Sequence, residues 1–216
     1  MIKVIYIDHM GSDLSVVNAA RVSFGKKSDW LHPANGKWSG LREGDTKLIN
    51  YLAEHKHMSP FGHAFASFHI KAPIFVARQL VKHKFLRWNE ISRRYVDDEP
   101  EFYVPDEWRG RADDKKQGSS GVVDVEALAY LSNSNDKALI TYQECLNAGV
   151  CPEQARMVLP QSTMTEWYWS GSLDAFIAMC NLRCKEDTQY ETRLVADYIR
   201  SEMIKLFPVS VEALIK

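Results

Sequence analysis

The chain carries a dense group of basic side chains near its middle. Residues 78–95 contain six basic side chains and one acid, Glu90, although the whole chain has a net charge of −1. Like charges this close repel one another unless an anion neutralises them, so the segment predicts a site for a phosphate or carboxylate. Hydrogen-bonding and aromatic side chains are interleaved with the charges, namely Gln79, His83, Trp88, Asn89, Ser92 and Tyr95. This mixture favours a planar heterocycle that carries a phosphate.

Less specific explanations of the same segment are open from the residues alone. The charges would also suit the solvated face of an amphipathic helix, with Glu90 as a structural counterion. A nucleic-acid-binding module would use the basic side chains for phosphates and would stack bases on Trp88 and Tyr95. The net charge of −1 counts against this last class of protein.

Three blocks of residues follow one another in an order that is typical of one enzyme family. In the central block, Lys82-His83-Lys84 is followed after seven residues by Ser92. The other blocks are residues 57–63 continuing into 68–79, and residues 153–160 with 167–169 and 181–183. Together they resemble the flavin-dependent thymidylate synthases, whose signature is usually Arg-His-Arg, seven residues and Ser. The resemblance covers nearly the whole chain beyond the first strand.

The resemblance implies a reaction and its participants. This family makes thymidylate from deoxyuridylate (dUMP), with 5,10-methylenetetrahydrofolate as one-carbon donor and NADPH-reduced FAD as hydride source. It also implies a homotetramer with active sites between subunits, and no nucleic-acid or membrane partner. An inactive relative that still binds dUMP is the alternative within the family.

The resemblance further assigns roles to individual residues. Arg183 matches the position that binds and polarises the uracil ring, and its planar donors suit the imide edge of that ring. Standing alone, Arg183 would be interpreted as a cation near a helix C-terminus. The positions implied for dUMP binding are Gln79, Glu90, Ser92, Arg94, Arg156 and Arg183. Those implied for FAD are His57, Ser59, Arg78, Lys82, His83, Lys84 and Glu90.

Five positions depart from the family pattern. Lys82 and Lys84 stand where arginines are usual. Lysine keeps the positive charge but cannot form the bidentate hydrogen bonds of a guanidinium. Ser172, Asp174 and Ala178 occupy positions where the family often has Asn, Arg and Asn against the flavin. These differences predict either weaker FAD binding or contacts from other residues.

Length and composition predict a single domain over residues 1–216. A chain of 216 residues with 45% hydrophobic content can bury a substantial core. No run approaches the roughly 20 apolar residues that cross a bilayer, and Lys3 and Asp8 interrupt the first strand too early for a signal peptide. We therefore expect a cytoplasmic protein. The four cysteines and seven histidines lack metal-ligand spacing, which predicts free thiols and no metal site.

The elements that must position these residues indicate an α+β fold. Strands and helices are interspersed irregularly, which favours an antiparallel or mixed sheet flanked by helices, and no Gly-x-Gly-x-x-Gly predicts a Rossmann turn. We expect strands at 2–8, 64–71 and 163–170, and helices at 12–22, 45–55, 73–85, 124–148, from Pro152 through Arg156, 173–185 and 188–206. Residues 24–44 are expected to form a long ordered loop, 97–123 a mobile surface loop, and the chain after Pro208 a C-terminal tail.

Overall fold

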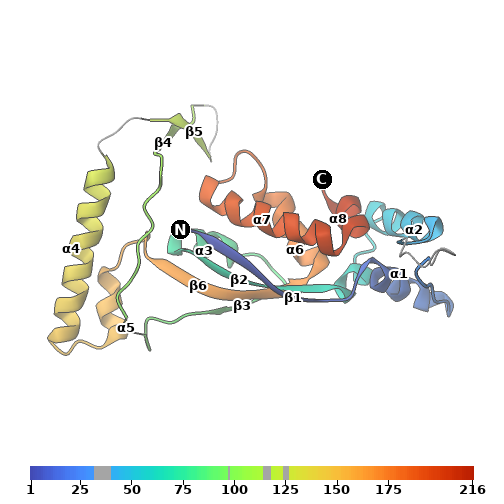
Figure 1. Cartoon of the computed structure of the whole chain (residues 1–216), viewed down its shortest axis with the longest axis horizontal. Coiled ribbons are helices and arrows are strands. Elements are labelled where there is room, and N and C mark those ends of the chain that lie inside the picture. The colour runs from blue at the N-terminus through green and yellow to red at the C-terminus, as the bar shows by residue number, and fades with distance from the viewer. Residues whose placement is uncertain (32–39, 97, 114–117, 124–126) are drawn as a thin grey trace.

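A four-stranded antiparallel sheet forms the centre of the molecule (Figure 1). The computed structural model describes residues 1–31, 40–96, 98–113, 118–123 and 127–216. The strand order is β1-β2-β6-β3. Their bounds are Lys3–Met10 for β1, Phe65–Pro73 for β2, Leu86–Glu90 for β3 and Met164–Ser172 for β6. This arrangement confirms the predicted α+β class with an antiparallel sheet.

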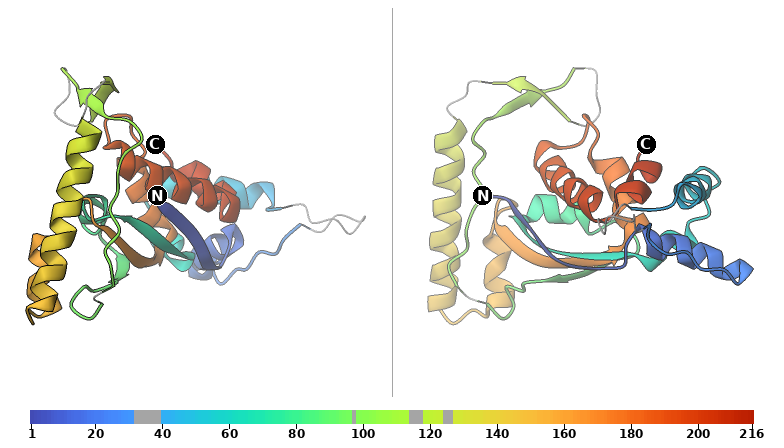
Figure 2. Two further views of the ribbon diagram at one scale, coloured as in Figure 1. Left: turned by 60° about the vertical axis from the view of Figure 1, so that its left-hand side comes forward. Right: turned by 45° about the vertical axis from the view of Figure 1, so that its right-hand side comes forward.

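Helices cover one face of this sheet and stand at both of its ends (Figures 1 and 2). The covering helices are α3 (Ile74–Leu80), α6 (Leu173–Arg183), α7 (Tyr190–Leu206) and α8 (Pro208–Leu214). One end carries α1 (Asp13–Arg21), the 3-10 turns η1 (Val22–Phe24) and η2 (Ser59–His63), and α2 (Glu43–Glu54). The other end carries β4 (Arg109–Arg111), β5 (Ser119–Val122), α4 (Ala127–Asn147), α5 (Pro152–Ala155) and the 3-10 turn η3 (Arg156–Val158). Strands β4 and β5 pair with each other as a separate two-stranded hairpin.

The covered face of the sheet supplies most of the core. Phe68 and Ile70 of β2 and Trp167 and Trp169 of β6 are fully buried against the helices. Trp88 of β3 extends this layer, because its ring stacks on Trp167 with the ring centroids 4.4 Å apart. Successive side chains of a strand point to opposite faces, so the residues between these aromatics lie on the other face of the sheet. Among the described residues no helix covers that face (Figures 1 and 2).

The predicted helix over 73–85 is wrong in its second half. The helix ends at Leu80, and Phe85 adopts a left-handed φ of 65° that turns the chain into β3. Gly171 of the neighbouring strand allows this turn to come close, because a Cβ there would lie only 2.5 Å from a methyl of Leu86. The basic segment is thus divided among a helix, a turn and a strand, and its side chains do not share one helix surface.

Two other predictions about surface segments need correction. Residues 97–123 are not a plain loop, because they contain β4 and β5 and because Phe102 forms a β-bridge with Thr163. Residues 97 and 114–117 of that predicted loop lie outside the described residues. The chain after Pro208 is the helix α8 rather than a tail.

The remaining predicted elements occur near their expected bounds. Arg156 lies just beyond α5, in the turn η3. Residues 32–39 of the predicted loop and 124–126 of the predicted long helix lie outside the described residues. All four cysteines are free, as predicted. In the described parts of the chain, no helix is long and apolar enough to cross a membrane, and no three His, Cys, Asp or Glu side chains are grouped to hold a metal ion.

Candidate active site

A cavity of about 800 Å³ lies where α3, the end of α6 and the start of α7 meet the β4–β5 hairpin. Three residues identified from the sequence line it: Gln79, Lys82 and Arg183. We call it the Arg183 cavity. Aromatic side chains form much of its wall, namely Phe75, Tyr103, Trp108 and Tyr190. Aromatic walls beside a guanidinium and amides suit a planar heterocycle with polar edges.

Arg183 is held in place by two hydrogen bonds. It is the last residue of α6 and is half-buried. Its Nε–H donates to Nε2 of His83 at 3.0 Å, and Nη2 donates to the carbonyl oxygen of Gln79 at 3.4 Å. Burial lowers the pKa of Arg183 from its ordinary value, but arginine stays charged throughout the physiological range. A guanidinium has five donors, so these contacts leave others for a ligand.

A pair of amides adjoins Arg183 in the same cavity. Nε2 of Gln79 donates to Oε1 of Gln189, the residue that precedes the first turn of α7. Both side chains line the Arg183 cavity. Gln189 was not identified from the sequence, because only the packing of α7 against α3 brings it to Gln79. The pair leaves donors and acceptors on both amides that a bound heterocycle or sugar would meet.

His83 must be neutral to hold Arg183 in this way. Burial, and secondly the charge of Arg183, lower the pKa of His83 from 6.5 to about 4. The unfolded chain therefore binds more protons than the folded chain between about pH 6.5 and pH 4. We expect the free energy of unfolding to fall as the pH drops through this window. The expected loss is about 1–2 kcal/mol, because the partly exposed ring reduces the full effect.

Chemical denaturation at pH 7 and pH 4.5 measures this effect. A His83→Gln variant should lose the part of the pH dependence that His83 causes. His63→Gln, at an exposed histidine, should behave like the unaltered protein. If His83→Gln shows the same pH dependence as the unaltered protein, His83 is not the neutral acceptor described here.

The other residues predicted to bind dUMP do not line the Arg183 cavity. Glu90 accepts a hydrogen bond from Oγ1 of Thr165 at 2.6 Å and another from Nε1 of Trp88 at 3.0 Å. Within the described chain Glu90 forms no ion pair, so its contacts do not support the counterion alternative. Arg94 donates from Nε to Oγ of Ser92 at 3.3 Å.

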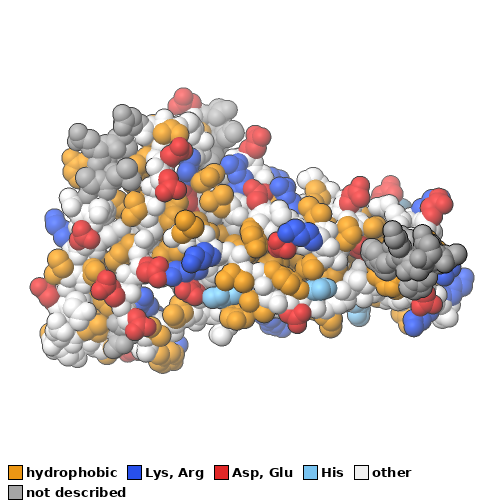
Figure 3. Space-filling model, viewed as in Figure 1, with side chains coloured by type: hydrophobic (Ala, Val, Ile, Leu, Met, Phe, Trp, Pro, Cys, Tyr) orange, Lys and Arg blue, Asp and Glu red, His pale blue; other side chains and the backbone are white. Residues whose placement is uncertain are grey.

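Two further observations concern the basic side chains on the surface. Arg156 is exposed, and its Nε donates to the backbone carbonyl of Glu153 at 3.3 Å. Arg78 and Lys84 are exposed and line neither this cavity nor the one described next. Basic and acidic side chains are interspersed on the face shown in Figure 3, without a continuous basic stripe. This face therefore lacks the pattern of a nucleic-acid-binding surface.

A second cavity, of about 620 Å³, lies at the other end of the sheet between α1, η1, α2 and η2. His57 and Ser59, both predicted to bind FAD, line it, and we call it the His57 cavity. Its described lining includes the cations Arg21 and Lys26 and no acid. Apolar groups and the ring of Tyr51 complete it. Such a lining suits an aromatic group with negative charge. The predicted FAD positions are thus divided within one chain between separate places.

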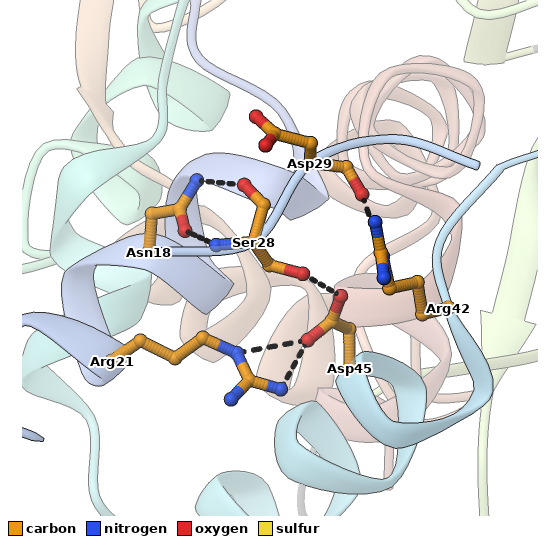
Figure 4. A network of polar contacts seen from close by, with 6 residues as sticks. All are labelled: Asn18, Arg21, Ser28, Asp29, Arg42 and Asp45. Carbon is orange, nitrogen blue, oxygen red and sulfur yellow. Dashed lines mark hydrogen bonds and ion pairs between the residues drawn. The ribbon is translucent and has the colours of Figure 1, made fainter. Parts of the chain in front are cut away.

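A buried polar network holds one wall of the His57 cavity (Figure 4). Asp45 of α2 is fully buried, and its carboxylate accepts from Nε of Arg21 at 2.9 Å and from the hydroxyl of Ser28. Asn18 adds two hydrogen bonds to the backbone of Ser28, at 2.7 and 3.0 Å. The network therefore joins α1, α2 and the segment that follows η1. This segment carries Lys26 into the cavity wall.

Three of the residues that depart from the family pattern lie at the start of α6 and within it. Ser172 precedes the first turn of the helix, and Asp174 lies in that turn, where the helix dipole favours a carboxylate. Ala178 is exposed in the middle of the helix. None of the three lines either cavity. The contacts within this chain do not assign them to a flavin.

Comparisons with known proteins agree with the resemblance seen in the sequence. The family described as "Thymidylate synthase complementing protein" matches residues 6–209. A flavin-dependent thymidylate synthase of Thermus thermophilus is 42% identical over 200 residues, which are 92% of this chain and 70% of that protein. The enzyme of the same name from Thermosipho africanus is 38% identical over 216 residues, 97% of this chain and 89% of its own length.

A solved structure shares the fold. It is the UMP/dUMP methylase PolB from Streptomyces cacaoi, bound with 5-Br dUMP. Its TM-score is 0.82 at 30% sequence identity, and the match covers 99% of this chain and 94% of that one.

Proposed function

Because this chain belongs to the family of flavin-dependent thymidylate synthases, we propose that it converts dUMP to thymidylate by reductive methylation. The one-carbon donor is methylenetetrahydrofolate, and NADPH is the reductant. When bound, FAD supplies the hydride to the transferred carbon. The methylene group and the hydride together form the methyl group, C5 of the pyrimidine loses its proton, and tetrahydrofolate and NADP⁺ are released. The enzyme is a methyltransferase.

The Arg183 cavity is the observation that carries this proposal. Carbon C5 of uracil attacks a one-carbon unit only when negative charge on the ring is stabilised. Arg183 offers a fixed, permanently charged donor group for that charge, since His83 and Gln79 hold it. The amides of Gln79 and Gln189 are placed to bind sugar or ring oxygens. Lys82 lines the same cavity and suits the phosphate as a point charge.

A second copy of the chain completes the site in this proposal. Glu90, Ser92, Arg94 and Arg156 lie outside the Arg183 cavity of their own chain, so they would contact dUMP bound to a neighbouring subunit. The uncovered face of the sheet supports such an assembly, because the large apolar side chains Ile5, Phe65 and Tyr168 are 40–51% exposed there. Exposed apolar side chains gathered on one face mark an interaction surface. We propose the homotetramer typical of the family.

The His57 cavity fits a flavin by the chemistry of its lining. Arg21, Lys26 and His57 offer positive or donor groups, and no acid of the described lining opposes an anion. We propose that His57 and Ser59 contact FAD there. Arg78, Lys82, His83, Lys84 and Glu90 would meet the cofactor where subunits adjoin.

Release of tritium from C5-labelled dUMP tests the proposed function. The purified protein, supplied with FAD, NADPH and methylenetetrahydrofolate, should release tritium and form thymidylate in equal amounts. Omission of NADPH should abolish thymidylate formation. Absence of release at saturating FAD, together with measurable dUMP binding, would instead identify an inactive dUMP-binding relative.

A further inference from the structure

The side chain of Arg109, in β4, joins the β4–β5 strand pair to the start of α7. Its Nη2 forms an ion pair with Oε1 of Glu191, and its Nε donates to Oγ of Ser119 at 3.2 Å. The guanidinium carbon also lies 4.3 Å from the ring centroid of Tyr190. These four side chains line the Arg183 cavity. Arg109 thus joins two walls of that cavity.

Glu191 carries a charge that is costly without Arg109. Its side chain is only 5% exposed, whereas that of Arg109 is 21% exposed. A buried carboxylate needs a partner, because water cannot solvate it. The charge is also felt within the cavity wall, where burial and secondly Glu191 raise the pKa of Tyr103 to about 12. An unpaired Glu191 would repel any anionic ligand in the cavity.

We propose that Arg109 is a positioning residue for the nucleotide substrate. It neutralises the charge of Glu191, so that the cavity lining keeps a net positive charge for a nucleoside monophosphate. It also holds the β4–β5 hairpin in place as a wall of the cavity. This inference rests on the proposed function, because it takes dUMP as the ligand of the Arg183 cavity. It gives Arg109 two separable effects. Neutralisation of Glu191 raises the affinity only for a ligand that carries a phosphate, whereas the wall raises the affinity for any nucleoside, charged or uncharged.

The experiment compares the binding of dUMP and uncharged deoxyuridine to the protein without flavin. The ratio of the deoxyuridine Kd to the dUMP Kd measures how much the phosphate group alone contributes to the affinity. Arg109→Ala should lower this ratio by about tenfold or more, and it should also weaken the binding of deoxyuridine. Arg109→Ala with Glu191→Gln should restore the ratio to within about threefold of the unaltered protein, because the repelling charge is gone. Deoxyuridine binding should stay weak in both variants.

Controls and a second variant make each outcome decisive. Arg193 also lies near Tyr190, at 5.7 Å, but does not line the cavity, so Arg193→Ala should leave the ratio unchanged. Glu191→Gln alone should raise the ratio, and it answers the question if Arg109→Ala does not fold. An equal loss for both ligands in Arg109→Ala, with an unchanged ratio in Glu191→Gln, would overturn the inference while leaving dUMP binding established. If the unaltered protein binds neither ligand, the proposed function itself fails, and this inference fails with it.

Discussion

Replacing Arg183 by lysine is expected to lower the rate of tritium release from C5-labelled dUMP by about a thousandfold. Lysine keeps the positive charge but has no planar fork of donors. Its single nitrogen is too small to reach His83, Gln79 and the pyrimidine edge together, which the wider guanidinium would do in the proposed complex. The charge that develops on the ring would lose its fixed partner. Because Arg183 ends α6 and is half-buried, we expect little change in thermal stability.

Initial rates at saturating FAD, NADPH and folate measure this effect. A matched control is Arg200→Lys, since Arg200 pairs with Asp197 on α7 at 3.0 Å and lines neither cavity. Its activity should stay within about twofold, because lysine keeps the charge of this partly exposed ion pair and the pair lies away from both cavities. A turnover of Arg183→Lys within tenfold of the unaltered enzyme would remove Arg183 from the catalytic role.

Replacing Asp45 by asparagine is expected to destabilise the fold by about 2–3 kcal/mol, because the hydrogen bonds that its charge strengthens become weaker. Asp45 is fully buried and is paired with Arg21 at 2.5 Å. Asparagine removes the charge, so Arg21, whose side chain is 28% exposed, loses its counterion, and the buried position keeps only a weaker, neutral hydrogen-bond acceptor. A neutral amide would also hold the Ser28 hydroxyl less strongly than the carboxylate does, which would loosen the segment that forms a wall of the His57 cavity (Figure 4). We therefore expect weaker flavin uptake as well.

Urea denaturation of the protein without flavin measures the change in the free energy of unfolding. Glu43→Gln is the matched control on the same helix, because Glu43 is exposed and its ion pair with Lys47, at 2.6 Å, is a surface contact. It should cost no more than about 0.5 kcal/mol. Replacing both partners, Arg21→Met with Asp45→Leu, should recover much of the lost stability. If Asp45→Asn stays within about 1 kcal/mol of the unaltered protein, the network is not the support described here.

The elements and several site residues could be predicted because their causes are local. Alternating apolar residues predicted β2, a run of aromatic and hydroxyl side chains predicted β6, and the proline at 152 marked the start of α5. The helix ending at Arg183 also followed from its own residues. The family signature depends on the order of residue types along the chain, so three blocks in one order identified the family.

Two of the errors have a different cause, because contacts with distant parts of the chain helped to decide those segments. Residues 86–90 became a strand since β6 offers an edge and Gly171 leaves room for the turn at Phe85. Residues 109–111 pair with 119–122, and the contact with Glu191 of α7 holds them. Strand β6 and Glu191 lie far along the sequence from the segments that they hold.

Residue order alone determined the family and the chemical types of side chain that its reaction needs. Only the tertiary structure decided which of them meet. It brought Gln79, Lys82 and Arg183 to one cavity with the unexpected Gln189 and Arg109, and it left Glu90 and Arg156 outside. The physical reason is that hydrogen bonding and charge pairing act over a few ångströms in space, whereas Arg183 lies 100 positions from its partner His83.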